Sequence, residues 1–402
     1  MRKILPLLAV ALAWPAAAAD SRPKVRAITA FINIDARNYE AQYAETMKFL
    51  DSARAAYRAA GFEVEGVRIA TQPFPRYIGG MKPEEGLAFL RKLDELSTRL
   101  KFAPNIGAAM LRDDDSTATF DTLAQALAST RLNASLVIAG EDGIHWRALH
   151  EAARLIDKVG RISPHGRGNL NFAATAMVKA YGPFYPGAWH EGEGRTFAIG
   201  LEGAGVVADV FARYHDPREA EQQLTAALAA PLREAEAVAT KVAAESRWHY
   251  AGIDPTPAPL GDVSIGRAIE SLIGGPFGSS GTMTAARIIT AAVQAAPVKR
   301  TGYSGLMVPV LEDNVLAKRW AEGAFNIDSL LAYSAVCAGG LDTVPLPGDI
   351  GVERLARILG DVASLAYKWN KPLAARLLPV PGGKPGDRTD FGDSRMSDTV
   401  IR

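Results

Sequence analysis

The feature that most constrains the fold is an alternation of apolar strand and helix patterns near the N-terminus. Residues 25–34 are an apolar run with β-branched side chains, which predicts a buried strand. Residues 39–60 carry apolar side chains at helical spacing and end before Gly61, a residue typical of helix C-termini. Residues 62–71 alternate and predict a second strand. Strand, helix and strand in this order form the unit of a parallel sheet, so we expect an α/β fold.

The alternation continues along the chain. We expect further strands at residues 105–111, 134–139, 172–179, 195–201, 303–310 and 374–380. We expect further helices at residues 84–101, 117–129, 144–159, 217–247, 264–273, 283–294 and 351–368. No internal repeat and no break in composition marks a second domain. The sequence therefore predicts one large domain over residues 20–380 and a Gly-, Pro- and Asp-rich tail over residues 381–402.

The first residues have the composition of a targeting segment. Arg2 and Lys3 precede an apolar stretch at residues 4–14, which is too short to span a bilayer. Small residues follow, and the alanines up to Ala19 fit a signal-peptidase site. We expect residues 1–19 to be a secretory signal peptide and the mature protein to be periplasmic, without a membrane span.

The charges of the chain nearly cancel, with 45 Lys and Arg against 44 Asp and Glu. No basic tract stands out, so the sequence gives no electrostatic reason to expect binding to nucleic acid or to an anionic membrane. We expect a small-molecule ligand or substrate as partner, and the sequence leaves a homo-oligomer open.

The single cysteine, Cys337, is followed by two glycines, Asp342 and a Pro-Gly-Asp turn. This pattern predicts a strand, a tight loop and a second strand end, and such a loop can present a thiol to a cavity. Two other interpretations remain open: a small buried core residue, or a route to a disulfide-linked dimer.

A second stretch of unusual composition, residues 181–205, is rich in Pro, Gly and aromatic residues around His190 and Glu193. A histidine beside a carboxylate can act as a general base, whereas polar tips on a surface loop are the alternative interpretation. His145 and His150 are five residues apart, and zinc-binding pairs on a helix are usually four apart, so we predict no metal site and no cofactor.

A Gly/Ser-rich loop precedes the helix predicted at residues 283–294. Its backbone N–H groups are candidates to bind a carboxylate or phosphate, because a helix N-terminus favours anions. Acidic residues in nearby loops complete the candidate binding set, which consists of Gly278, Ser279, Ser280, Gly281, Thr282, Asp254, Glu312 and Asp313.

Six motifs together resemble those of the family known as domain of unknown function 711, or uncharacterised protein family 0210. The motifs start at Val25, Gly187, Asp254, Gly281, Ser304 and Cys337. The resemblance implies a fold like that of pyruvate formate-lyase: an α/β barrel of about ten strands with an internal finger loop, here carrying Cys337. The residues at 390–393 differ from the C-terminal glycine motif of glycyl-radical enzymes, so we do not expect glycyl-radical chemistry.

These observations lead to three functional hypotheses. The first is a hydrolase or lyase acting on a small polar metabolite, with Cys337 as nucleophile or acid, His190 as base, and Glu193 or Asp342 as orienting carboxylate. The alternative is a non-catalytic periplasmic small-molecule-binding protein. The third is an interaction protein in which Cys337 is only a core residue.

Overall fold

Ten strands form one mixed sheet in the computed structural model, which describes residues 21–402. The sheet order is β8-β7-β1-β2-β3-β4-β6-β10-β9, and the short β5 pairs with β4. The strands are β1 (Lys24–Ile32), β2 (Val67–Thr71), β3 (Ala103–Ala108), β4 (Asn133–Gly140), β5 (Gly143–Ile144), β6 (Phe172–Ala176), β7 (Thr196–Glu202), β8 (His249–Asp254), β9 (Gly340–Pro347) and β10 (Leu373–Val380). The mixed α/β class is confirmed, and the predicted signal peptide lies outside the described residues.

The strands run in two opposite directions. The central set is here called the first half, and the second half consists of β8 and β7 at one edge and β10 and β9 at the other. Strands β1, β2, β3, β4 and β6 are parallel to one another. β7 and β8 are mutually parallel, as are β9 and β10, but β7 is antiparallel to β1 and β10 is antiparallel to β6. The residues that begin the strands of the first half therefore lie at the same edge as the residues that end the strands of the second half.

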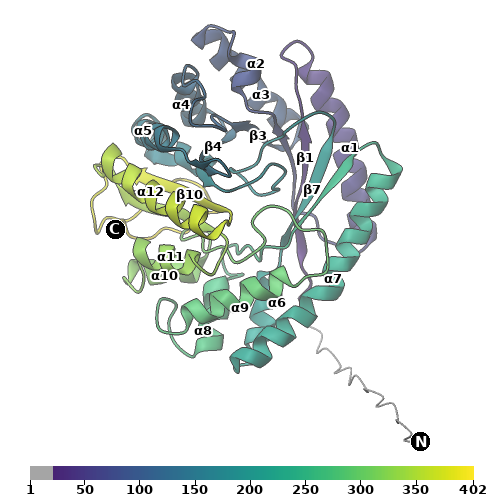
Figure 1. Cartoon of the computed structure of the whole chain (residues 1–402), viewed down its shortest axis with the longest axis vertical. Helices are drawn as coiled ribbons and strands as arrows, with labels where there is room; N and C mark the ends of the chain where they lie inside the picture. The colour runs from purple at the N-terminus through teal and green to yellow at the C-terminus, as the bar shows by residue number, and fades with distance from the viewer. Residues whose placement is uncertain (1–20) are drawn as a thin grey trace, which may run out of the picture.

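Helices surround the sheet on the outside (Figure 1). They are α1 (Tyr39–Ala59), α2 (Pro75–Ile78), α3 (Pro83–Leu100), α4 (Phe120–Ser129), α5 (Trp146–Ile162), α6 (Ala204–Phe211), α7 (Pro217–Glu245), α8 (Ile265–Ile273), α9 (Thr282–Gln294), α10 (Asn314–Ala321), α11 (Ile327–Ser334) and α12 (Val352–Trp369). Their apolar faces pack on the strands, and β6 and β7 are buried along their whole length, as expected for a sheet covered on both faces. Across residues 21–402, no helix has the length and apolar character needed to cross a membrane.

The sheet is open, and residues 299–311, here called the closing segment, lie between its two edge strands. At one end of the segment, Ile253 of β8 donates its N–H to the Lys299 carbonyl at 2.8 Å. At the other end, Val310 donates its N–H to the carbonyl of Asp342 in β9 at 3.0 Å. The strand predicted at residues 303–310 is wrong, because the segment makes only isolated bridges to its neighbours. The structure therefore has an open ten-stranded sheet in place of the expected closed barrel, and irregular chain lies between its two edge strands.

The interior of the curled sheet is filled by residues 177–195, here called the inner loop, which connect β6 to β7. Thr29 donates its hydroxyl to the Pro183 carbonyl at 3.0 Å, and Asn105 donates its side-chain N–H to the Pro186 carbonyl at 2.7 Å. Phe184 and Trp189 pack inside the sheet against residues of β4 and of the closing segment. The structure corrects the expectation of a finger loop carrying Cys337: the internal loop is residues 177–195.

The C-terminal tail, residues 381–402, is folded onto the body of the protein. Trp320 donates its indole N–H to the Val400 carbonyl at 2.9 Å, and Ser397 donates its backbone N–H to the Leu311 carbonyl at 2.6 Å. Phe391 and Ile401 are fully buried. The tail therefore belongs to the same packed unit as the sheet.

Candidate functional site

A cavity of about 420 Å³ lies at the edge where the strands of the first half begin. Arg26 and Arg68, near the starts of β1 and β2, line one side. Tyr185 of the inner loop, Tyr303 of the closing segment and Arg395 of the tail complete the walls. Segments that are far apart in the sequence therefore meet around one hollow, which is the usual setting of a ligand site.

The cavity is rich in arginine. Six arginines and three acidic residues line it: Arg26, Arg68, Arg131, Arg167, Arg376, Arg395, Glu312, Asp342 and Asp393. Desolvated guanidinium groups are the preferred protein partners of carboxylates and phosphates. The composition of the walls therefore favours an anionic ligand.

Most of these arginines are already paired within the protein. Arg26 contacts Glu65 and Glu202, each at 3.0 Å, and Arg395 contacts Asp393 at 2.7 Å. The Arg131 side chain donates to the hydroxyls of Ser97 and Thr98 on α3 and contacts Asp94 at 3.3 Å. Their charges are balanced by these acidic partners.

Two lining arginines, Arg68 and Arg167, have no carboxylate within ion-pair distance among residues 21–402, and of these Arg167 is exposed whereas Arg68 is half-buried. The Arg68 guanidinium donates one hydrogen bond to the Pro183 carbonyl at 3.2 Å and lies 4.9 Å from the centre of the Tyr185 ring. Burial lowers the pKa of Arg68 to about 10, and nearby Arg26 contributes in the same direction. The side chain stays charged at neutral pH, and it is a half-buried cation that an anionic ligand would stabilise.

Arg376 on β10 joins two acidic residues predicted to form part of the site. Its Nε donates to Asp342 at 2.7 Å, and an Nη on the same edge of the guanidinium donates to Glu312 at 2.6 Å. Burial raises the pKa of Asp342, and the neighbouring Glu312 charge raises it further. Burial would also raise the pKa of Glu312, but the charge of Arg376 holds it below its ordinary value. Two adjacent carboxyl groups with shifts in opposite directions can divide the roles of acid and base.

Cys337 does not line this cavity. Its side chain is 1 % exposed and packs in the core between sheet and helices, whereas the next residue, Ala338, packs inside the sheet. Burial raises the pKa of the Cys337 thiol above its ordinary value. The position is that of a core residue, and the structure does not support a nucleophile at this cysteine.

The burial of Cys337 predicts a slow reaction with iodoacetamide. We expect alkylation of the folded protein to be at least about 100-fold slower than alkylation in urea, because the reagent must wait for local opening. Mass spectrometry of timed samples measures both rates. Equal rates in the folded and unfolded protein would show that the thiol is accessible.

His190 and Glu193 also lie away from the arginine-lined cavity. His190 is fully buried beside Tyr181, and neither ring nitrogen has a hydrogen-bond partner among residues 21–402. Burial lowers its pKa to about 4, so the imidazole is neutral at pH 7. Glu193 is exposed at a smaller hollow of about 230 Å³, lined also by Ile32 at the opposite end of β1 from Arg26. The predicted base and its orienting carboxylate are therefore not paired, and neither contacts Cys337.

Asp254 and Asp313 hold the backbone in place. The buried Asp254 carboxylate accepts the N–H groups of Tyr303 at 2.7 Å and Ser304 at 3.0 Å, which fixes the start of the closing segment. Burial raises its pKa to about 6. Asp313 caps α10 by accepting the N–H groups of the first helical turn, and it accepts the Ser264 hydroxyl at 2.6 Å. These contacts explain both residues without a ligand.

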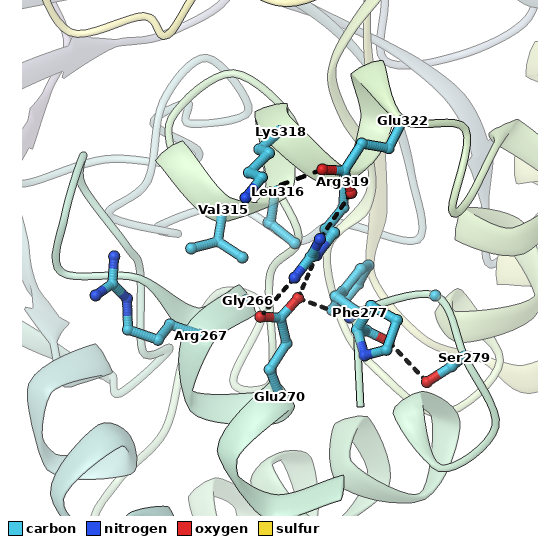
Figure 2. A network of polar contacts seen from close by, with 12 residues as sticks. Gly266, Arg267, Glu270, Phe277, Ser279, Val315, Leu316, Lys318, Arg319 and Glu322 are labelled. Carbon is cyan, nitrogen blue, oxygen red and sulfur yellow. Dashed lines mark hydrogen bonds and ion pairs between the residues drawn. The ribbon is translucent and has the colours of Figure 1, made fainter. Parts of the chain in front are cut away.

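The predicted anion cradle at residues 278–282 is an exposed loop whose amides are largely bonded within the protein. Gly278 donates its N–H to the Thr282 hydroxyl at 3.1 Å, and Ser279 donates its N–H to the Pro276 carbonyl at 3.0 Å. Figure 2 shows the anchor of this loop: Glu270 accepts the Phe277 N–H at 2.9 Å and pairs with Arg319 at 2.6 Å. The loop, which includes Ser280 and Gly281, lies outside the arginine-lined cavity.

Of the predicted residues, the structure thus brings only Glu312 and Asp342 together in the main cavity. The arginines and Tyr303 were missed. A signal for three of them was present: Arg68 and Arg376 are the only charged residues of β2 and β10, and Arg26 follows Lys24 at the start of β1, whose remaining residues are uncharged. Among residues 21–402, no group of three or more His, Cys, Asp or Glu side chains is arranged to hold a metal ion.

Fold and cavity define this chain as a mixed α/β protein with an arginine-lined cavity at one end of a ten-stranded sheet. The family model described as "Uncharacterised ACR (DUF711)" matches residues 18–394, and the chain belongs to this family.

Relatives of the chain carry the name UPF0210 protein. The one from Pyrobaculum arsenaticum is 35% identical over 289 residues, which cover 68% of this chain and 63% of the relative, less than two thirds of its length. The one from Pyrobaculum aerophilum is 34% identical over 355 residues, 83% of this chain and 77% of the relative. Among solved structures, the anaerobic ribonucleotide reductase from Thermotoga maritima with dATP bound in the specificity site has a TM-score of 0.36 at 8% identity, covering 88% of this chain and 75% of that chain.

Proposed function

We propose that this protein binds a small metabolite carrying a carboxylate or phosphate group in the arginine-lined cavity. The observation that carries the proposal is Arg68, a half-buried cation without an acidic partner at the cavity wall. A charge in this position costs free energy in the empty protein, and an anion bound to it would recover that cost through charge-assisted hydrogen bonds.

The size of the cavity supports a small ligand. A volume of about 420 Å³ lies in the lower part of the range typical of metabolite pockets. The aromatic walls at Phe184 and Tyr185 and the buried Met307 add apolar surface next to the arginines. A compact molecule with an anionic group and a short carbon skeleton fits these walls best.

The same cavity supports acid–base chemistry as a second candidate function. Asp342 and Glu312 share Arg376, and their pKa values shift in opposite directions, which suits a proton donor and acceptor pair. Because Cys337 is absent from the walls, the cysteine-dependent hydrolase or lyase has no support in this geometry. Anion binding without turnover is the function that the contacts support best.

A thermal-shift series tests the proposal. We expect phosphate, citrate and 2-oxoglutarate at about 10 mM to raise the melting temperature by several degrees, because a ligand at about 100 times its Kd stabilises the native state by about 2.7 kcal/mol. Sodium chloride at matched ionic strength is the control for screening, and choline is the control for a cationic solute. Equal melting temperatures with all of these solutes would refute anion binding.

We also propose that the chain is exported, on the basis of the basic, apolar and small-residue pattern of residues 1–19. Expression of the full chain in a Gram-negative host, followed by fractionation and intact-mass analysis, tests this proposal. Export predicts a periplasmic product that begins at Asp20, whereas a cytoplasmic product with the full N-terminus would contradict it.

A further inference from the structure

Tyr303 has a hydroxyl group that the fold positions but does not use. The residue lines the arginine-rich cavity, and its side chain is 7 % exposed. Its backbone is fixed, because Asp254 accepts the N–H groups of both Tyr303 and Ser304. Within residues 21–402, no hydrogen bond involves the Tyr303 hydroxyl, although buried tyrosine hydroxyls usually have a partner.

Gly187 of the inner loop has no side chain and therefore leaves space for the Tyr303 hydroxyl. A Cβ atom added at Gly187 would lie 2.7 Å from the Tyr303 hydroxyl oxygen, closer than such contacts allow. Any other residue at position 187 would therefore displace the phenol ring. The hydroxyl is not among the fully enclosed polar atoms without a partner, so it is accessible from the cavity, where a ligand oxygen can accept its hydrogen bond.

The hydroxyl is available as a hydrogen-bond donor. Burial raises the pKa of Tyr303 well above its ordinary value, and the charges of Asp342 and Asp254 raise it further. The phenol therefore keeps its proton across the physiological pH range. The same cavity holds Arg68, so one ligand of suitable size can meet a cationic group and a neutral donor at once.

We propose that the cavity selects an anion that carries a second oxygen on its carbon skeleton, a hydroxy or oxo acid or the corresponding phosphate ester, with the anionic group at Arg68 and the second oxygen at Tyr303. This inference rests on the proposed function and adds a ligand class to it. A site built to hydrogen-bond such an oxygen discriminates against the analogue that lacks it, because the buried donor is then left unpaired.

Paired ligands test the inference by calorimetric titration. The carboxylate pair is butyrate and 2-oxobutyrate, and the phosphate pair is propyl phosphate and 2-hydroxypropyl phosphate, so the members of each pair differ by one oxygen on the carbon skeleton. For the pair that the cavity binds, we expect the wild-type protein to prefer the member with the additional oxygen by about tenfold, which corresponds to one hydrogen bond. Tyr303→Phe should lose this preference while keeping the affinity for the simpler anion. Tyr367→Phe, a change at an exposed tyrosine on α12, is the matched control and should keep it.

Two kinds of result would overturn the inference: one concerns the role of Tyr303 alone, and the other concerns anion binding as a whole. Equal affinity of the wild-type protein for both members of a bound pair, or an equal loss for both in Tyr303→Phe, would refute the role of Tyr303 and leave anion binding intact. Absence of binding by all four compounds would refute the proposed function, and the ligand class with it. Unchanged melting temperatures of the unliganded variants confirm that a difference in affinity does not come from misfolding.

Discussion

Replacing Arg376 with methionine should lower the free energy of unfolding by about 3–5 kcal/mol, because it leaves two buried carboxylates without their counter-charge. Arg376 contacts Glu312 at 2.6 Å and Asp342 at 2.7 Å, and all three side chains are less than a fifth exposed. Equilibrium unfolding in urea measures the loss. The triple variant Arg376→Met, Glu312→Gln, Asp342→Asn removes all three charges, and we expect it to recover most of the stability. A loss below about 1 kcal/mol in the single variant would contradict the ion-pair arrangement.

The pH dependence of the Arg376→Met loss has a definite sign. Without the guanidinium, burial raises the pKa values of both carboxyl groups above those in the unfolded chain, so the folded variant binds protons more readily. Its stability should therefore rise as the pH falls from 8 to 5, relative to the wild type. In the triple variant the difference should be flat over the same range, and unfolding curves at several pH values distinguish the two patterns.

Replacing Arg68 with methionine should weaken anion binding roughly 10- to 100-fold, since charge-assisted hydrogen bonds contribute about 1.5–3 kcal/mol. Titration with the anion that gives the largest thermal shift measures the change. Arg131→Met is the matched control, because Arg131 lines the same cavity but donates to residues of α3 and contacts Asp94. We expect its affinity to stay within about twofold of the wild type.

The same Arg68 variant separates a binding residue from a structural one. Arg68 donates a single hydrogen bond, to a Pro183 carbonyl that Thr29 also contacts, and it has no ion pair to lose. The free energy of unfolding should therefore stay within about 1 kcal/mol of the wild type or increase, as is common where function requires an unfavourable charge. A large loss of stability with unchanged anion affinity would assign Arg68 to the fold rather than to a site.

Local patterns predicted the strands and helices well, because apolar periodicity reflects which faces are buried. The helix predicted at residues 39–60 is α1, and the strand predicted at residues 134–139 is β4, each within one residue of the observed ends. Residues 303–310 have a strand-like pattern but lie between two sheet edges, where Asp254 and Thr290 accept backbone N–H groups in place of a neighbouring strand. Such contacts involve residues distant in sequence, and no window of the sequence contains them.

The candidate site was only partly predictable for the same reason. Glu312 and Asp342 were identified as polar residues near turns, yet their shared partner Arg376 is located in another strand. The orientation of Cys337 could not be read from its loop, because the adjacent residues Cys337 and Ala338 face opposite sides of the sheet. Arginines inside apolar strands were the available signal. An inward-facing charge is costly in such a strand, so its presence indicates a partner or a ligand.

The most direct measurement is the anomalous difference map of a crystal soaked in selenate, a phosphate-like anion with a strong anomalous signal. The account predicts a peak inside the cavity within about 4 Å of the Arg68 guanidinium, and its absence from a crystal of Arg68→Met grown and soaked in the same way. Anomalous peaks only elsewhere on the protein, with no peak near Arg68, would contradict the assignment of this cavity as an anion site.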